Sequence, residues 1–178
     1  THVVALERPG SAPDGHRYSM RGEILDDVAP AADRLFSPDP GRGWVTLAVG
    51  DGGNELGMGR LRETLKDDVP RGSLIFCASP ADHTLACGIS NWGGYALAAA
   101  LSVLSGALLL RTPDQERELL AALVEGGAVD GCTRERALSV DGLSWEEYSP
   151  TLQAIYDLVS GMLRARNKGT EPEADRGN

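Results

Sequence analysis

The stretch WVTLAVGDGGNELGMG, residues 44–59, indicates the fold class of this chain. Its first seven residues are apolar on both faces of an extended chain, which is typical of a strand inside a parallel sheet covered by helices. A short amphipathic segment at 60–69 and a further apolar run at 73–79 follow. The order strand, loop, helix, strand predicts a βαβ unit, and we expect an α/β fold with a mostly parallel sheet flanked by helices.

The segments on either side extend this pattern. Residues 2–8 are apolar and β-branched, which predicts a strand. Residues 90–106 are apolar nearly all round, which predicts a central helix packed on the sheet. Residues 9–43 contain five prolines and five glycines, so we expect a long and mostly irregular connection there.

The second half of the chain shows further helix signals. Capping boxes at Thr112 and Ser144 each predict the start of a helix. Residues 167–178 are polar and contain proline and glycine, which predicts a disordered tail. The length of 178 residues suits one domain with its own core, which we assign to residues 1–166.

The composition narrows the class of partner. The chain has 26 acidic and 17 basic residues, for a formal net charge of −9. This charge argues against binding to nucleic acid or to an anionic membrane, and it suits a small metabolite or a cation. No run reaches the roughly 18 apolar residues of a membrane span. The three cysteines form no CxxC pair, so we expect reduced cysteines in a cytoplasmic protein, and homo-oligomer formation is left open.

The glycine-rich loop after the strand is the first candidate site. A dinucleotide fingerprint starting at Gly50 would need glycine or alanine where Glu55 stands, and no P-loop Gly-Lys-Ser/Thr is present, so we expect no nucleotide. Asp51, Asn54 and Glu55 instead offer the oxygen ligands that Mg²⁺, Mn²⁺ or Ca²⁺ prefers. The alternative, that these side chains only form turn hydrogen bonds or face water, is equally open.

A second candidate group follows the apolar run at 73–79. Residues after a strand and at the start of a helix are expected to line the crevice where open α/β sheets bind ligands. These residues are Asp82, His83, Ser90, Asn91 and Gly93. The helix start favours a carboxylate, and a glycine there permits close approach. A lone histidine is more often structural than catalytic, although the neighbouring aspartate favours a role for His83.

The segment ERPGSAPDGHRYSMRG, residues 7–22, supplies a third group. Glu7 and Arg8 end the first predicted strand on the crevice side. Arg8, Arg17 and Arg21 are candidates for clamping an anionic substrate, although surface arginines without such a role are common.

These motifs resemble the D-glutamate cyclase family, specifically the C-terminal domain of the mitochondrial enzyme and its stand-alone bacterial relatives. The resemblance covers roughly residues 2–165. Its main motifs are the segment at 7–22, GDGGNELGMG at 50–59 and ADHTLACGISNWGGYALAAAL at 81–101, and VDGCT at 129–133 and VDGL at 140–143 also fit.

The resemblance implies an α/β lyase that cyclises D-glutamate, an acidic amino acid, to 5-oxo-D-proline with loss of water, assisted by a divalent cation. Relatives are mostly longer at the N-terminus, so we expect either a trimmed chain or a shorter member that lacks an N-terminal part of the family fold. Two alternatives stay open. One is a metal-dependent hydrolase or lyase acting on another small carboxylate, and the other is a non-catalytic module that binds a metabolite or a cation.

The chemistry implied by the resemblance gives each candidate residue a role. The predicted cation ligands are Asp51, Glu55, Asn54 and Glu7. The predicted catalytic residues are His83 as acid and base, Asp82 as its orienting partner, and Glu55. The predicted substrate contacts are Ser90, Asn91 and Gly93 at the helix start, with Arg8 and Arg21 as further candidates.

Overall fold

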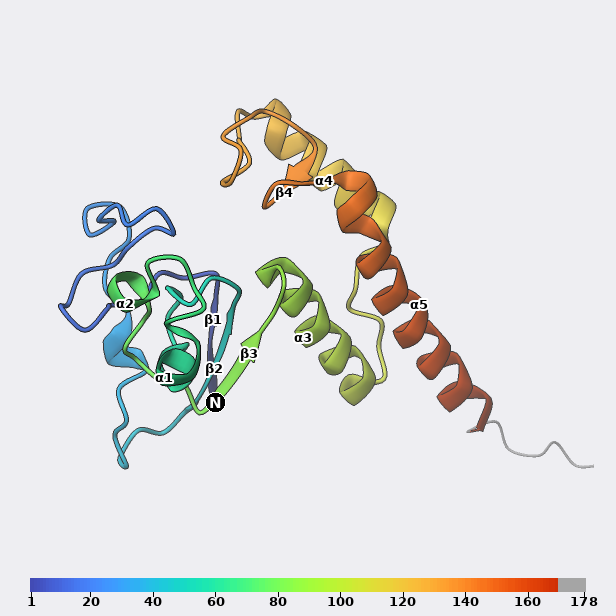
Figure 1. The fold of residues 1–178 in the computed structure, drawn as a ribbon. Helices are drawn as coiled ribbons and strands as arrows, with labels where there is room; N and C mark the ends of the chain where they lie inside the picture. Colours follow the sequence, from blue (N-terminus) through green and yellow to red (C-terminus); the bar gives the residue numbers. More distant parts are fainter. Residues whose placement is uncertain (170–178) are drawn as a thin grey trace, which may run out of the picture. The chain divides into compact units, whose positions relative to one another are not determined.

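A computed structural model describes residues 1–169 of the chain (Figure 1). The described residues group into two compact units, Thr1–Gly94 and a second that begins at Tyr95. The predicted single domain over 1–166 stays a prediction, because two compact units can belong to one domain. The predicted tail at 167–178 begins inside a helix, and its remainder, 170–178, lies outside the described residues.

The first unit contains a parallel sheet of three strands in the order β1-β2-β3. The strands are β1 (His2–Leu6), β2 (Val45–Gly50) and β3 (His83–Ala86). The middle strand β2 is the most buried of the three, since Ala48 and Val49 have no exposed surface. The predicted α/β class and the predicted strands at 2–8 and 44–50 are therefore confirmed.

The strand predicted at 73–79 is wrong. This segment forms the single helical turn α2 (Gly72–Ile75) followed by irregular chain, and the third strand of the sheet is β3. The apolar run has another cause, because Ile75, Phe76 and Cys77 are fully buried in the core without pairing in the sheet. A short buried run of this kind cannot be told from a strand by its hydrophobicity alone.

Short helical turns and one carboxylate organise the connections of this unit. The amphipathic segment at 60–69 overlaps the 3-10 turn η2 (Gly59–Leu61) and contains the helix α1 (Arg62–Leu65). The long connection at 9–43 is mostly irregular, as predicted, and contains η1 (Asp33–Leu35). The Asp33 carboxylate accepts bonds from Ser11 N at 3.0 Å, Ser11 Oγ at 2.9 Å and Ser79 Oγ at 2.6 Å, which holds the connection against the rest of the unit.

Helix α3 (Ser90–Ser105) matches the predicted helix at 90–106 and continues past Gly94 into the second unit. The second unit further contains α4 (Pro113–Glu125), the small hairpin of β4 (Ser139–Val140) and β5 (Leu143–Ser144), and α5 (Trp145–Gly169). The capping box predicted at Thr112 is present, with Gln115 N donating to Thr112 Oγ1 at 3.2 Å and Thr112 N to Gln115 Oε1 at 2.9 Å. The second box is present as well, since Glu147 and Ser144 exchange the corresponding bonds.

A buried carboxylate orders the loop before the hairpin. Asp130 Oδ1 accepts from the backbone N–H groups of Cys132 and Thr133, at 2.8 and 2.9 Å. Its Oδ2 accepts from Ser139 Oγ at 2.7 Å and from Gly142 N at 3.0 Å. Burial by itself would raise the pKa of Asp130, but these donors outweigh it and lower the pKa to about 2. The aspartate of the VDGCT motif thus fixes the conformation of this loop.

Candidate cation site at the carboxyl end of the sheet

The parallel sheet brings the ends of β1 and β2 together. Leu6 lies opposite Val49, so Glu7 and the residues after Gly50 leave the sheet at the same edge. The backbone N–H of Glu7 still donates to Val49 O at 3.2 Å, although Glu7 itself turns into the left-handed region with φ of 52°. Glu7 is therefore fixed beside the glycine-rich loop that follows β2.

Three carboxylates converge at this edge. One carboxylate oxygen from each of Glu7, Asp51 and Glu55 lies within 4.8 Å of those of the other two. Glu7 and Asp51 are exposed, whereas Glu55 is only 3% exposed. Such a group of hard oxygen atoms is the kind of donor set that binds Mg²⁺, Mn²⁺ or Ca²⁺.

The glycine-rich loop wraps around its own glutamate. Glu55 Oε1 accepts from the backbone N–H groups of Asp51 and Gly52, at 3.2 and 2.8 Å, and Oε2 accepts from Gly53 N at 2.7 Å. Gly53 has a φ of +91°, which a residue with a side chain rarely adopts. The loop thus forms an anion cradle of backbone N–H groups, and its anion is the Glu55 carboxylate.

The surroundings of Glu55 leave its negative charge incompletely balanced. Burial raises the pKa of the Glu55 carboxyl, and the nearby Asp51 charge raises it further, while the loop N–H groups lower it. The net result is a pKa above the ordinary value. A cation at this edge would counter both the repulsion and the cost of burial.

The start of helix α3 reaches the same edge. The backbone N–H of Ser90 donates to Asp51 Oδ2 at 2.7 Å, which places Asp51 at the positive end of the helix. Ser90 is 3% exposed, and its hydroxyl has no hydrogen-bond partner among the described residues. A Cβ added to Gly93 would lie 2.4 Å from Val49 Cγ1, so the lack of a side chain there lets the helix approach β2 closely.

Two comparisons with known proteins identify the family of this chain. A family model described as "D-glutamate cyclase-like, C-terminal" matches residues 1–156. The chain belongs to this family. Human mitochondrial D-glutamate cyclase is 32% identical to it over 187 aligned residues, which cover 91% of this chain and 30% of the human protein. The chain thus spans less than a third of the length of that relative, and the family resemblance of its motifs is confirmed.

The position predicted for Asp82 and His83, in the crevice at the carboxyl edge of the sheet, is wrong. His83 begins β3 opposite Leu47, three residues before the end of β2 at Gly50, so both residues lie toward the amino end of the sheet. That register places His83 roughly 10 Å along the strands from the carboxyl edge. The error follows from the strand predicted at 73–79, because β3 begins where a loop was expected.

Asp82 has other partners than the neighbouring histidine. Its Oδ2 accepts from Thr46 N at 2.8 Å and Thr46 Oγ1 at 3.0 Å, and it forms an ion pair with Arg42. The bonds from Thr46 contribute most to lowering the pKa of Asp82 below its ordinary value. Asp82 thus joins the start of β3 to β2, and the acid and base role of His83 stays a prediction.

The remaining predicted site residues lie in varied surroundings. Asn54 is buried and its Nδ2 donates to Tyr18 O at 2.7 Å, which ties the glycine-rich loop to the 9–43 connection. Arg8 donates to Pro30 O, and Arg17 pairs with Asp26 at 2.9 Å. Arg21 and Asn91 are exposed. The ligand and substrate roles of these residues stay predictions.

Sequence reasoning missed the backbone donors of this family's glycine-rich loop. The backbone N–H groups of residues 51–53 donate to Glu55. Two of these residues are glycines, which have no side chain that would indicate such bonds. A signal is present all the same, because an acidic residue two to four positions after a Gly-Gly pair can fold back onto the turn.

No disulfide joins the three cysteines in the described residues, and burial raises the pKa of Cys77 to about 11, in keeping with a packing role. None of the described helices is long and apolar enough to span a membrane.

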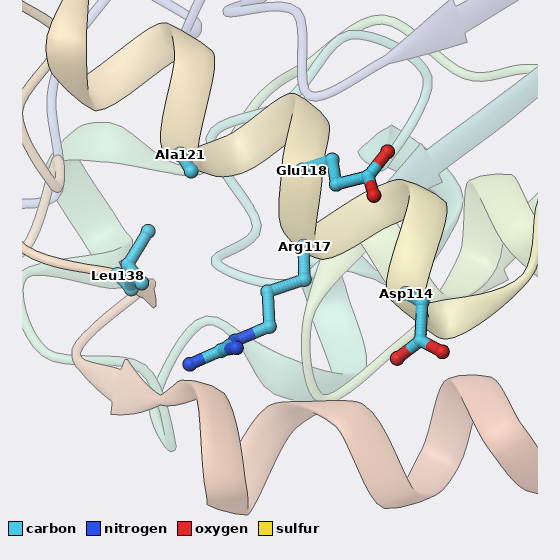
Figure 2. Close-up of a pocket in the computed structure, with 5 residues that line it drawn as sticks. All are labelled: Asp114, Arg117, Glu118, Ala121 and Leu138. Atoms are coloured by element: carbon cyan, nitrogen blue, oxygen red, sulfur yellow. The ribbon is translucent and has the colours of Figure 1, made fainter.

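The second unit has a cavity of about 390 Å³ lined by Asp114, Arg117, Glu118, Ala121 and Leu138 (Figure 2). Charges of both signs line it, and it contains none of the predicted site residues.

Proposed function

We propose that this chain carries the cation and substrate site of a D-glutamate cyclase. The reaction is the cyclisation of D-glutamate to 5-oxo-D-proline with loss of water. The observation that carries the proposal is the convergence of Glu7, Asp51 and Glu55 beside the start of α3. Membership of the family and the name of the human relative support the reaction.

The chemistry explains why such a site suits this substrate. The α-nitrogen of glutamate attacks the γ-carboxyl carbon, a C–N bond forms, a C–O bond breaks, and the oxygen leaves as water with two protons from the ammonium group. At neutral pH the nitrogen is protonated and the γ-carboxylate is a poor electrophile because it is negatively charged. The site must therefore neutralise the carboxylate, accept a proton and hold the two ends of the substrate together.

A divalent cation bound where the Glu7, Asp51 and Glu55 carboxylates converge would supply the neutralising charge and polarise the γ-carboxyl group. The donor set fits this use, because all three side chains offer oxygen and Ser90 N fixes the orientation of Asp51. Mg²⁺ and Mn²⁺ are the cations that we propose.

The start of α3 is the proposed site for the α-carboxylate of the substrate. The helix end is positive, and the buried hydroxyl of Ser90 has no partner among the described residues. Asn91 lies exposed beside it, and Gly93 has no side chain to obstruct an approach. Of the predicted catalytic residues, Glu55 belongs to this edge of the sheet and His83 does not.

The test is direct. The full-length protein is incubated with D-glutamate and Mg²⁺ or Mn²⁺, and 5-oxoproline is followed by chiral chromatography, with L-glutamate as the substrate control. We expect the D product, and we expect its loss in Asp51→Asn. Glu63→Gln is the matched control, because Glu63 is exposed and pairs with Arg62 and Lys66, outside the candidate site.

The two alternatives predict other results. Cation binding without turnover of any small acid would replace the cyclase by a cation-binding module. Turnover of a different small carboxylate would keep an enzyme but change its substrate.

A further inference from the structure

Glu55 differs from the other two carboxylates in how its oxygens are used. A carboxylate has about four lone-pair positions, and three of those on Glu55 already accept bonds from Asp51 N, Gly52 N and Gly53 N. Glu55 is also buried, whereas Glu7 and Asp51 are exposed. Turning Glu55 toward a cation would leave buried N–H groups of the loop unpaired, which is costly.

The space around Glu55 holds the carboxylate in this orientation. A Cβ added to Gly50 would lie 2.7 Å from Glu55 Oε2, so the carboxylate packs directly against the end of β2. Movement of the group in that direction is blocked by backbone. The three bonds and this contact together define one position for the side chain.

The backbone on both sides of Glu55 is hydrogen-bonded to the segment that follows Glu7. Leu56 N donates to Arg8 O at 2.7 Å, and Gly10 N donates to Asn54 O at 3.0 Å. These bonds join the segment just after Glu7 to the glycine-rich loop. Glu55 thus orders the loop of Asp51 through its side chain, while its own backbone segment is joined to the chain that carries Glu7.

We propose that Glu55 is a positioning residue of this site: its carboxylate stays bound to the N–H groups of residues 51–53, and Glu7 and Asp51 supply the oxygens that ligate the cation. The inference rests on the proposed cation site, and it assigns ligation and positioning to different carboxylates. Glu55 contributes negative charge and geometry without leaving its cradle. Supporting residues of this kind typically change metal affinity by about 10- to 100-fold when they are lost.

The test measures amide hydrogen exchange by NMR on the full chain, with and without saturating Mg²⁺. In the wild type we expect Gly52 and Gly53 to be protected without Mg²⁺ and to keep that protection, within about threefold, when Mg²⁺ is bound. In Glu55→Gln we expect the protection of these amides and the calorimetric Mg²⁺ affinity each to fall about tenfold or more.

A matched variant separates this role from simple support of the fold. Asp33→Asn also removes a carboxylate that accepts three bonds in the same unit, from Ser11 and Ser79. We expect Asp33→Asn to lower the melting temperature and to leave the Mg²⁺ affinity of the folded protein unchanged. Both variants are measured at a temperature where each is folded.

Three results would overturn the inference. The first is loss of protection at Gly52 and Gly53 on adding Mg²⁺ to the wild type, because it would show that Glu55 turns to the cation. The second is unchanged Mg²⁺ affinity in Glu55→Gln. The third is absence of Mg²⁺ binding by the wild type, which would remove the cation site as well. If Mg²⁺ binds as expected and no 5-oxoproline forms, the reaction fails while the positioning role stands.

Discussion

Ser90 N and Asp51 Oδ2 are joined by a hydrogen bond of 2.7 Å, so the first turn of α3 and the glycine-rich loop share one carboxylate. The bond commits one oxygen of Asp51 to the protein and leaves the other available to a ligand. Asp51 therefore has two separable functions, one in holding the helix start and one in providing charge.

Substitution of Asp51 tests this separation. Asp51→Asn keeps an oxygen for Ser90 N but removes the charge, so we expect near-normal stability and a Mg²⁺ affinity lowered about tenfold or more. Asp51→Ala also leaves Ser90 N without its partner, and we expect a further loss of about 1 to 2 kcal/mol in the free energy of unfolding. Calorimetry with Mg²⁺ and urea unfolding measure the two effects. Equal stability of the two variants would contradict the structural function.

Gly50 offers a test of the cradle that leaves every carboxylate in place. A Cβ in Gly50→Ala would lie 2.7 Å from Glu55 Oε2 and must displace the carboxylate from the loop. We expect a lower Mg²⁺ affinity, by about tenfold, together with a loss of about 1 to 3 kcal/mol of stability. Gly43→Ala is the control, because no atom of the other described residues, its two chain neighbours aside, lies within 4 Å of an added Cβ there. Wild-type Mg²⁺ binding by Gly50→Ala would show that the cradle does not shape the site.

Substitution of His83 or Asp82 should affect cation binding less than substitution of the converging carboxylates. Because both lie toward the amino end of the sheet, we expect His83→Gln and Asp82→Ala to leave Mg²⁺ affinity unchanged. Asp82→Ala should lower the melting temperature, since Thr46 loses two hydrogen bonds to that carboxylate. Thermal melts and calorimetry check both expectations. A large loss of turnover in His83→Gln with unchanged Mg²⁺ binding would support its predicted acid and base role.

Asp130 makes the stability of the second unit depend on acid pH. Its pKa of about 2 lies below the ordinary value of 3.8, so the folded state favours the ionised form. The resulting stability is fully present above about pH 4 and is lost as the pH falls toward 2. We expect Asp130→Asn to be less stable at neutral pH, by about 1 kcal/mol, and to lose less stability between these pH values. Urea unfolding across this range is the measurement, with the exposed Asp67→Asn as the control.

The sequence predicted those elements of the fold that local chemistry defines. The buried strand at 44–50 and the helices after Thr112 and Ser144 follow from hydrophobic pattern and capping residues, which act within a few positions. The segment at 73–79 and β3 could not be told apart in this way. Their assignment depends on which of them pairs with β2, and that choice is made by tertiary packing around Phe76 and Cys77.

The same distinction applies to the candidate site. The proximity of Glu7 to Asp51 follows from the rule that parallel strands end at a common edge, and the sequence was sufficient to predict it. Asp82 and His83 were misplaced because the strand was predicted at 73–79, whereas the strand that pairs with β2 is β3. The bonds of Glu55 to its loop depend on the turn at Gly53, where φ is +91°, and the hydrophobic pattern of the sequence carries no information on that backbone angle.

The left-handed backbone of Glu7 has a consequence for protein engineering. A residue with a side chain at φ of 52° is less stable than glycine by about 1 kcal/mol, and Glu7→Gly would also relieve repulsion among the three carboxylates. The same change would remove one of the two proposed ligands. Selection for heat resistance and selection for the proposed catalysis would thus favour different amino acids at position 7. A search for variants with higher stability alone would discard a proposed cation ligand.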